Sequence, residues 1–191
     1  MTETPPPGTR RLPFSLITKP TGAACNLDCS YCFFLSKEVL WGHESQQMTA
    51  EMLDRFVRSY LDAQLDGGVT IGWQGREPTL RGPAFFKEAV RLSEQYRRSG
   101  QRVQHAIQTD GTLLDDEWGE FLAANGFLVG LSMDGPPELH DTYRVNKAGR
   151  GTYDQVRRVG TSCSDTASTR TSCAPSSSER GVSPRGVPPL P

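Results

Sequence analysis

Four short apolar segments alternate with four segments of helical periodicity, and this alternation constrains the fold more than any other feature. The apolar segments cover residues 14–19, 69–73, 103–109 and 127–133. The helical segments cover residues 49–61, 83–96, 115–125 and 152–159. Parallel strands joined by helices give this order, because a right-handed crossover returns the chain to the same edge of the sheet. The sequence therefore predicts an α/β fold with a parallel sheet.

The number of strand–helix units limits how far this sheet can close. A closed barrel of eight units requires roughly 250 residues, whereas this chain has 191 residues and enough pattern for about four units. We therefore expect an open, partial (βα) barrel. In such folds the functional site lies at the carboxyl ends of the strands. Here those ends lead into loops after Lys19, Trp73, Thr109 and Ser132.

Composition divides the chain into three parts. Residues 1–11 are rich in proline and polar residues and are expected to form a disordered arm, whereas residues 12–159 carry the pattern of one core domain. Residues 160–191 form a low-complexity Ser/Thr/Pro tail with few large apolar residues, which cannot offset the entropy cost of ordering. Cys163 and Cys173 lie in this tail without metal-ligand spacing, and we interpret them as incidental thiols.

Charge and hydropathy exclude several classes of partner. The 21 Lys and Arg residues nearly balance the 22 Asp and Glu residues, which gives a net charge of −1 and no basic field for nucleic acid or anionic membrane. No apolar run is long enough to span a membrane, and the amino-terminal segment lacks the pattern of a secretory signal. We therefore expect a cytoplasmic protein with no nucleic-acid or membrane partner.

Three of the five cysteines lie close together, as Cys25, Cys29 and Cys32 in a C-x3-C-x2-C pattern. An odd number of cysteines, clustered in this way, favours a metal site over a disulfide framework. Soft thiolate ligands select zinc, copper(I) or iron–sulfur clusters. Three cysteines suit a four-iron cluster with one iron left open. The alternatives are zinc with a fourth ligand such as His43, and a cysteine loop without metal.

Longer motifs around these loops resemble those of a known family. An aromatic residue before the last cysteine of C-x3-C-x2-C is typical of radical S-adenosylmethionine (SAM) enzymes, and Gln-Gly-Arg-Glu-Pro at 74–78 resembles their Gly-Gly-Glu-Pro motif. Within that superfamily, four stretches resemble the anaerobic sulfatase-maturating enzymes. These stretches are residues 19–25, 73–80, 108–114 and 130–141. The resemblance runs from about residue 14 to residue 159 and covers only the amino-terminal part of such enzymes.

The resemblance implies two cofactors, a [4Fe-4S] cluster and SAM. Cys25, Cys29 and Cys32 would hold three irons, and SAM would chelate the fourth through its amino and carboxylate groups. Tyr31 would pack near the adenine, and Glu77 would accept hydrogen bonds from the SAM ammonium. The other SAM-binding positions that the resemblance implies are Gln74, Gly75, Arg76, Pro78, Ser132 at the ribose, and Arg144. No residue of this chain is given a catalytic role.

Two positions depart from the family pattern. Arg76 stands where the family has glycine, and its side chain would either clash with the methionine group of SAM or turn outward. Asp110 stands where the family has asparagine, a milder change because both residues tolerate the same turn geometry. Asp134 and His140, in the last of the four loops, are expected to structure that loop.

The reaction that the resemblance implies is oxidation of a cysteine or serine in a sulfatase polypeptide to Cα-formylglycine, through a 5′-deoxyadenosyl radical. The chain would be a radical SAM oxidoreductase whose partners are an unfolded sulfatase segment and reduced flavodoxin or ferredoxin as electron donor. Two alternatives remain open. One is another radical SAM peptide-modifying enzyme, such as one that forms thioether crosslinks, and the other is a non-catalytic remnant that binds a cluster.

The family pattern fades after residue 159. The resemblance implies that complete enzymes are much longer and add the last strands of the barrel and a cysteine-rich domain with auxiliary clusters. We therefore expect a truncated or frame-shifted chain. Such a chain would release 5′-deoxyadenosine slowly and would not complete the oxidation of a peptide.

Overall fold

The computed structural model describes residues 12–34, 47–165 and 174–175, and five parallel strands form one sheet in the order β1-β2-β3-β4-β5. The strands are β1 (Leu16–Thr18), β2 (Gly67–Trp73), β3 (Gln101–Thr109), β4 (Leu128–Leu131) and β5 (Ala174–Pro175). The helices are α1 (Ala50–Ala63), the 3₁₀ helix η2 (Pro78–Arg81), α2 (Gly82–Tyr96), α3 (Asp116–Ala124), α4 (Pro137–Tyr143) and α5 (Tyr153–Asp165). The predicted α/β fold with a parallel sheet is confirmed.

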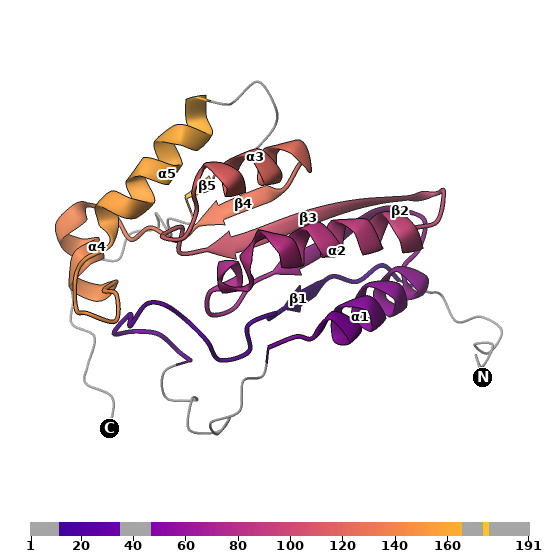
Figure 1. Cartoon of the computed structure of the whole chain (residues 1–191), viewed down its shortest axis with the longest axis horizontal. Coiled ribbons are helices and arrows are strands. Elements are labelled where there is room, and N and C mark those ends of the chain that lie inside the picture. The colour runs from indigo at the N-terminus through magenta and orange to yellow at the C-terminus, as the bar shows by residue number, and fades with distance from the viewer. Residues whose placement is uncertain (1–11, 35–46, 166–173, 176–191) are drawn as a thin grey trace.

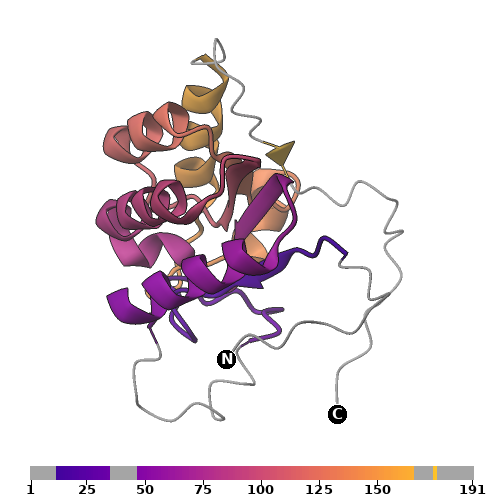
Figure 2. The same cartoon turned by 90° about the vertical axis from the view of Figure 1, so that its right-hand side faces the viewer.

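Helices α1, α2 and α3 cover one face of the sheet, and the carboxyl ends of the strands meet at one edge (Figure 1). Figure 2 shows this layer of helices beside the sheet in the turned view. The cysteine-bearing loop that follows β1 lies near α4 at that same edge (Figure 1). The predicted convergence of the strand-end loops therefore follows from the topology.

Local sequence signals explain where two of these helices begin and end. The Thr49 hydroxyl accepts a hydrogen bond from the Met52 amide at 3.1 Å and caps α1. Asp115 caps α3 in the same way, accepting from the Trp118 amide at 3.0 Å. Gly126 follows α3 with φ +61°, a conformation that favours glycine and stops the helix.

The core lies between the sheet and the helices. Alternate residues of β2, namely Val69, Ile71 and Trp73, are buried against them. Their partners from the helices are Leu53, Val57 and Leu61 of α1, Phe86 and Leu92 of α2, and Phe121 and Leu122 of α3. Burial of each such side chain stabilises the fold by about 1.5–3 kcal/mol. This layer holds the sheet, and hence the strand ends, in place.

A buried histidine lies inside this core between two aromatic rings. His105 of β3 stacks on Trp73 at 6.0 Å and on Phe127 at 5.0 Å between ring centroids. The Trp73 indole N–H donates to His105 Nδ1 at 3.1 Å. Burial lowers the pKa of His105 to about 4, so the ring is neutral. The hydrogen bond fixes which nitrogen carries the proton, because Nδ1 is the acceptor.

The opposite face of the sheet is less covered. The register places Ile17, Gly72, Ala106 and Leu128 in one row across β1 to β4, on the face that alternates with the buried one. The side chain of Ile17 is 67% exposed and that of Leu128 is 40% exposed. Small residues occupy the middle of this row, so the row is flat and apolar.

The carboxyl-terminal part departs from the expectation in three places. The helix predicted for 152–159 begins at Tyr153 and continues to Asp165, and β5 pairs in parallel with β4. Strand pairing uses backbone groups, and proline is tolerated on an edge strand, so periodicity of side chains did not predict β5. Helix α4 lies where the sequence predicted only a loop.

The rest of the predicted arm and tail lies outside the described residues. The division into 1–11, 12–159 and 160–191 therefore stays a prediction. Within the part of the chain that the structure describes, no helix combines the length and apolar composition needed to cross a membrane.

Candidate functional site

The loop that carries the three cysteines follows β1 and is held by the segment after α4. The Asp28 amide donates to the Val145 carbonyl at 2.8 Å, and the Ser30 amide donates to the Tyr143 carbonyl at 3.0 Å. Leu27, between the first two cysteines, is almost fully buried. Residues more than one hundred positions apart in the sequence therefore fix the backbone around Cys29.

Two further strand-end loops also contact the cysteine loop. The Asn26 amide group donates to the Thr112 hydroxyl at 2.7 Å, which ties the loop to the turn after β3. The Glu77 backbone amide donates to the Ala24 carbonyl at 3.4 Å, which ties it to the turn after β2. Together with the contacts after α4, these bonds confirm that the loops predicted from the sequence meet at one edge.

The three thiols are free and half-buried, and the surroundings of Cys25 and Cys29 disfavour the thiolate form. Burial raises the pKa of Cys25 to about 11, and the nearby carboxylates of Asp110 and Glu77 raise it further. Burial also raises the pKa of Cys29, whereas the Arg144 guanidinium opposes that rise. A bound metal centre would reverse this preference, because a coordinated thiol loses its proton.

A single metal ion and an iron–sulfur cluster require different spacings of their thiolate ligands. Among the described residues, no three or more His, Cys, Asp or Glu side chains gather closely enough to hold one metal ion, as a structural zinc requires. An iron–sulfur cluster spreads its thiolate ligands over separate irons, so the sulfurs need not converge on one point. The three separated thiols therefore fit the ligand set of a cluster. His43, the candidate fourth zinc ligand, lies outside the described residues.

Glu77 lies at the centre of the strand-end loops and is completely buried. Its Oε1 accepts hydrogen bonds from the Thr79 amide, the Thr79 hydroxyl and the Thr109 hydroxyl, at 2.9, 2.6 and 2.7 Å. Its Oε2 accepts from the Asp110 amide at 2.7 Å. Burial and the charge of Asp110 raise the pKa of Glu77 to about 7. The carboxylate thus joins the turns after β2 and β3.

Asp110 forms the turn that the family forms with asparagine. Its Oδ1 accepts from the Thr112 amide at 2.9 Å and from the Thr112 hydroxyl at 2.8 Å. Its Oδ2 is buried and has no hydrogen-bond partner among the residues that the structure describes. Two neighbouring buried carboxylates with an unsatisfied oxygen fit a small cation such as an ammonium group.

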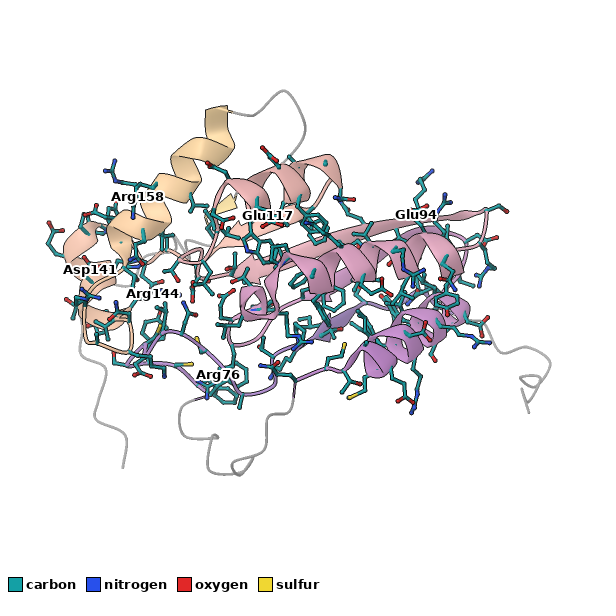
Figure 3. All side chains as sticks on the ribbon, in the orientation of Figure 1. Arg76, Glu94, Glu117, Asp141, Arg144 and Arg158 are labelled. Carbon is teal, nitrogen blue, oxygen red and sulfur yellow. The ribbon has the colours of Figure 1, made fainter. Side chains whose placement is uncertain are left out.

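The Arg76 side chain turns toward the end of the cysteine loop (Figure 3). Arg76 has φ +56°, and its guanidinium donates to the Phe34 carbonyl at 2.9 Å, so the side chain turns toward the end of the cysteine loop. The preceding Gly75 has φ +112°, and a Cβ atom there would lie 2.7 Å from the Lys19 side chain. Arg76 therefore adopts a backbone conformation that favours glycine and directs its guanidinium to Phe34.

Arg144, at the end of α4, forms a polar cluster with the residue next to Cys32. Its Nε donates to Asp134 Oδ2 at 2.7 Å, and the Tyr31 hydroxyl donates to the same oxygen. The guanidinium carbon lies 5.7 Å from the centroid of the Tyr31 ring, which is 53% exposed. Arg144 thus lies beside the cysteine loop with a partly open aromatic face next to it.

Ser132 is held at the end of β4 by two contacts. Its amide donates to the Thr109 carbonyl at 2.9 Å, and its hydroxyl accepts from the Gln108 side chain at 3.0 Å. Gln74 is exposed, and its backbone amide donates to the Thr18 carbonyl at 3.0 Å. Pro78 is the first residue of η2. All these predicted positions lie on the loops at the carboxyl ends of the strands.

Sequence reasoning assigned no role to Gln108 and underrated Asp134. Gln108 belongs to the same motif as Asp110 and lies near the carboxyl end of β3. Its place in that motif was the sequence signal that could have predicted its contact with Ser132. The Asp134–Arg144 ion pair carried no sequence signal, because its two members are joined by α4, which the sequence did not predict.

Comparison with known proteins agrees with this geometry. Residues 20–169 match the radical SAM superfamily, so the chain belongs to that superfamily. The serine-type anaerobic sulfatase-maturating enzyme of Bacteroides thetaiotaomicron is 42% identical over 145 residues, which are 75% of this chain and 35% of that enzyme. The cysteine-type enzyme of Clostridium perfringens is 39% identical over 148 residues, which are 77% of this chain and 40% of that enzyme.

Solved structures extend the similarity to three dimensions. The structure of native anSMEcpe with bound AdoMet and the Cp18Cys peptide has a TM-score of 0.72 and 36% sequence identity. The match covers 81% of this chain and 40% of that one. The partial barrel predicted from the sequence is therefore of the radical SAM type. The chain spans less than half the length of these relatives.

Proposed function

We propose that this chain binds a [4Fe-4S] cluster through Cys25, Cys29 and Cys32 and binds SAM beside it. The observation that carries the proposal is the cysteine loop itself. It presents three free, half-buried thiols, and the loops after β2, β3 and α4 hold it in place. When bound, the cluster and SAM together supply a 5′-deoxyadenosyl radical that removes a hydrogen atom from a substrate.

The residues around the loop supply binding and orientation. Asp110 and Glu77 offer negative charge to the ammonium of SAM, and the unsatisfied Asp110 Oδ2 is the acceptor that such a group would satisfy. Ser132 offers a hydroxyl at the strand end for the ribose, and Tyr31 offers a partly open ring face for the adenine. Arg144 adds a positive charge beside the Tyr31 ring.

The turn after β2 completes the predicted SAM-binding set. Gln74 and Pro78 flank this turn. Gly75 lets the backbone of the turn pass close to Lys19, because a Cβ at this position would collide with the Lys19 side chain. Arg76 contributes its backbone only, since its side chain turns to Phe34. We assign no catalytic role to any of these residues.

We further propose that the reaction is oxidation of a cysteine or serine of a sulfatase to Cα-formylglycine. Relatives named as serine-type and as cysteine-type enzymes are similar to this chain to nearly the same degree, so both kinds of peptide are candidate substrates. Reduced flavodoxin or ferredoxin is the proposed electron donor, and the cytoplasm is the proposed location.

Release of 5′-deoxyadenosine tests this proposal directly. The reconstituted chain is incubated without oxygen with SAM, dithionite and a sulfatase peptide containing C/S-x-P/A-x-R, and products are measured by mass spectrometry. We expect slow release that Cys29→Ala abolishes. Absence of 5′-deoxyadenosine from the iron-loaded chain would refute the proposal.

The same incubation tests how far the reaction proceeds. The sheet face that carries Ile17 and Leu128 is exposed at these residues, so water reaches the side where a peptide would react. We therefore expect no formylglycine from this chain alone. Repeated turnover to formylglycine would show that this open face does not limit the reaction.

A further inference from the structure

His140 is a second fully buried histidine, and unlike His105 it lies at the candidate site. It belongs to α4 and has no exposed surface. Its Nδ1 accepts a hydrogen bond from the Asp134 backbone amide at 3.3 Å, and its Nε2 lies 3.0 Å from the Thr152 hydroxyl. Both ring nitrogens are therefore used within the protein.

The direction of these bonds follows from the Thr152 hydroxyl. That hydroxyl has one hydrogen, which it donates to the Arg144 carbonyl at 3.0 Å. It must therefore accept from His140, so Nε2 carries the proton and Nδ1 is the acceptor. Burial lowers the pKa of His140, as does the charge of Arg144, which agrees with a neutral ring.

These contacts connect the two residues that form the Asp134–Arg144 ion pair. On one side His140 holds the Asp134 amide, and on the other it holds the Arg144 carbonyl through Thr152. The Arg144 amide also donates to the His140 carbonyl at 2.7 Å. A single imidazole thus connects Asp134, which precedes α4, with Arg144, which follows it.

We propose that His140 is a positioning residue that sets the affinity for SAM by holding Arg144 in place. The inference rests on the proposed function, because Arg144 is the proposed SAM contact. It goes beyond a role in loop structure, because His140 would change SAM affinity through the Asp134–Arg144 ion pair. Arg144 also lies close enough to influence Cys29, so its position matters on both sides of the site.

A double-mutant cycle of SAM binding tests the proposal. Dissociation constants are measured by equilibrium dialysis on the anaerobically reconstituted chain, for wild type, His140→Phe, Arg144→Gln and the double variant. We expect His140→Phe to weaken binding about tenfold, which corresponds to about 1.4 kcal/mol. The double variant should bind within about twofold of Arg144→Gln, because coupled residues are not additive. Iron content should not change.

Two further variants keep the outcome decisive. His140→Asn retains an acceptor for the Asp134 amide but lacks the Nε2–H that reaches Thr152, so it should also weaken SAM binding. It replaces His140→Phe if the larger ring prevents folding. His105→Gln removes the other buried histidine, which lies in the core, and should leave SAM affinity unchanged at a temperature below its unfolding transition.

The outcomes separate the two proposals. Equal affinity of wild type and the His140 variants, or additive losses in the cycle, overturns the role of His140 alone. Absence of SAM binding by the iron-loaded wild type overturns the proposed function instead.

Discussion

At the scale of single residues, Arg76 combines an unfavourable backbone with favourable side-chain contacts. A non-glycine residue at φ +56° costs about 1 kcal/mol. Its guanidinium donates to the Phe34 carbonyl at 2.9 Å, and the guanidinium carbon lies 5.8 Å from the centroid of the Phe34 ring. The backbone strain at Arg76 is thus offset locally.

Replacement of this residue by the family's glycine should therefore have little effect on stability. In Arg76→Gly, relief of about 1 kcal/mol of backbone strain offsets loss of a charged hydrogen bond. We expect the free energy of unfolding, measured with denaturant, to change by less than about 1 kcal/mol.

Arg81 provides a matched control for this prediction. It donates to the Met48 carbonyl at 3.0 Å and lies over the Phe85 ring, but its φ is −73°. Arg81→Ala has no strain to relieve and should cost about 1–2 kcal/mol. A loss from Arg76→Gly as large as that from Arg81→Ala would contradict the account of strain.

At the scale of elements, the cysteine loop depends on one apolar anchor. Leu27 is 3% exposed, and the Asp28 and Ser30 amides beside it bond to carbonyls after α4. Leu27→Ala should loosen this loop by about 2 kcal/mol. We expect exchange of these two amides to become about thirtyfold faster, as measured by hydrogen exchange and NMR.

A core leucine separates this local effect from global unfolding. Leu53→Ala, in α1, should lower the free energy of global unfolding while leaving local opening at Asp28 and Ser30 unchanged. If Leu27→Ala and Leu53→Ala speed up exchange of the same set of amides, the cysteine loop does not open independently of global unfolding.

The stacked histidine of β3 gives stability a pH dependence of known sign. The pKa of His105 is lowered to about 4 in the folded chain, whereas an unfolded histidine has its ordinary value near 6.5. Between these values the unfolded state binds more protons, so stability falls as pH falls from about 6.5 to 4. The loss is on the order of 3 kcal/mol.

Denaturant unfolding of wild type and His105→Gln at several pH values measures this effect. The variant lacks this titration, so its stability relative to wild type should improve steadily on acidification. A difference that does not vary between pH 7 and pH 4 would show that His105 is not the titrating group.

At the scale of the whole molecule, periodicity predicted the alternation of strands and helices because each strand and helix buries one side in a common core. Val69, Ile71 and Trp73 carry this signal in β2. The caps at Thr49 and Asp115 were equally local, since each bond spans three residues. The cysteines and their loop were predictable because ligand spacing is a property of the sequence itself.

The parts that were not predictable depend on contacts between distant residues. Burial of Glu77 arises from donors on two different loops, and the role of Arg144 depends on Asp134 across a helix that lacks a periodic pattern. The strand β5 pairs through backbone groups alone. Such features require the tertiary arrangement, which local patterns do not specify.

The central claim is that Cys25, Cys29 and Cys32 hold a four-iron cluster, and metal analysis of the reconstituted chain tests it most directly. Iron and sulfide are counted after anaerobic reconstitution of wild type, of the three single Cys→Ala variants, and of Cys163→Ala as control. We predict about four irons per chain for wild type and the control, and loss of the cluster in each of the three variants. Stoichiometric zinc without iron, or a cluster that survives all three substitutions, would contradict the account.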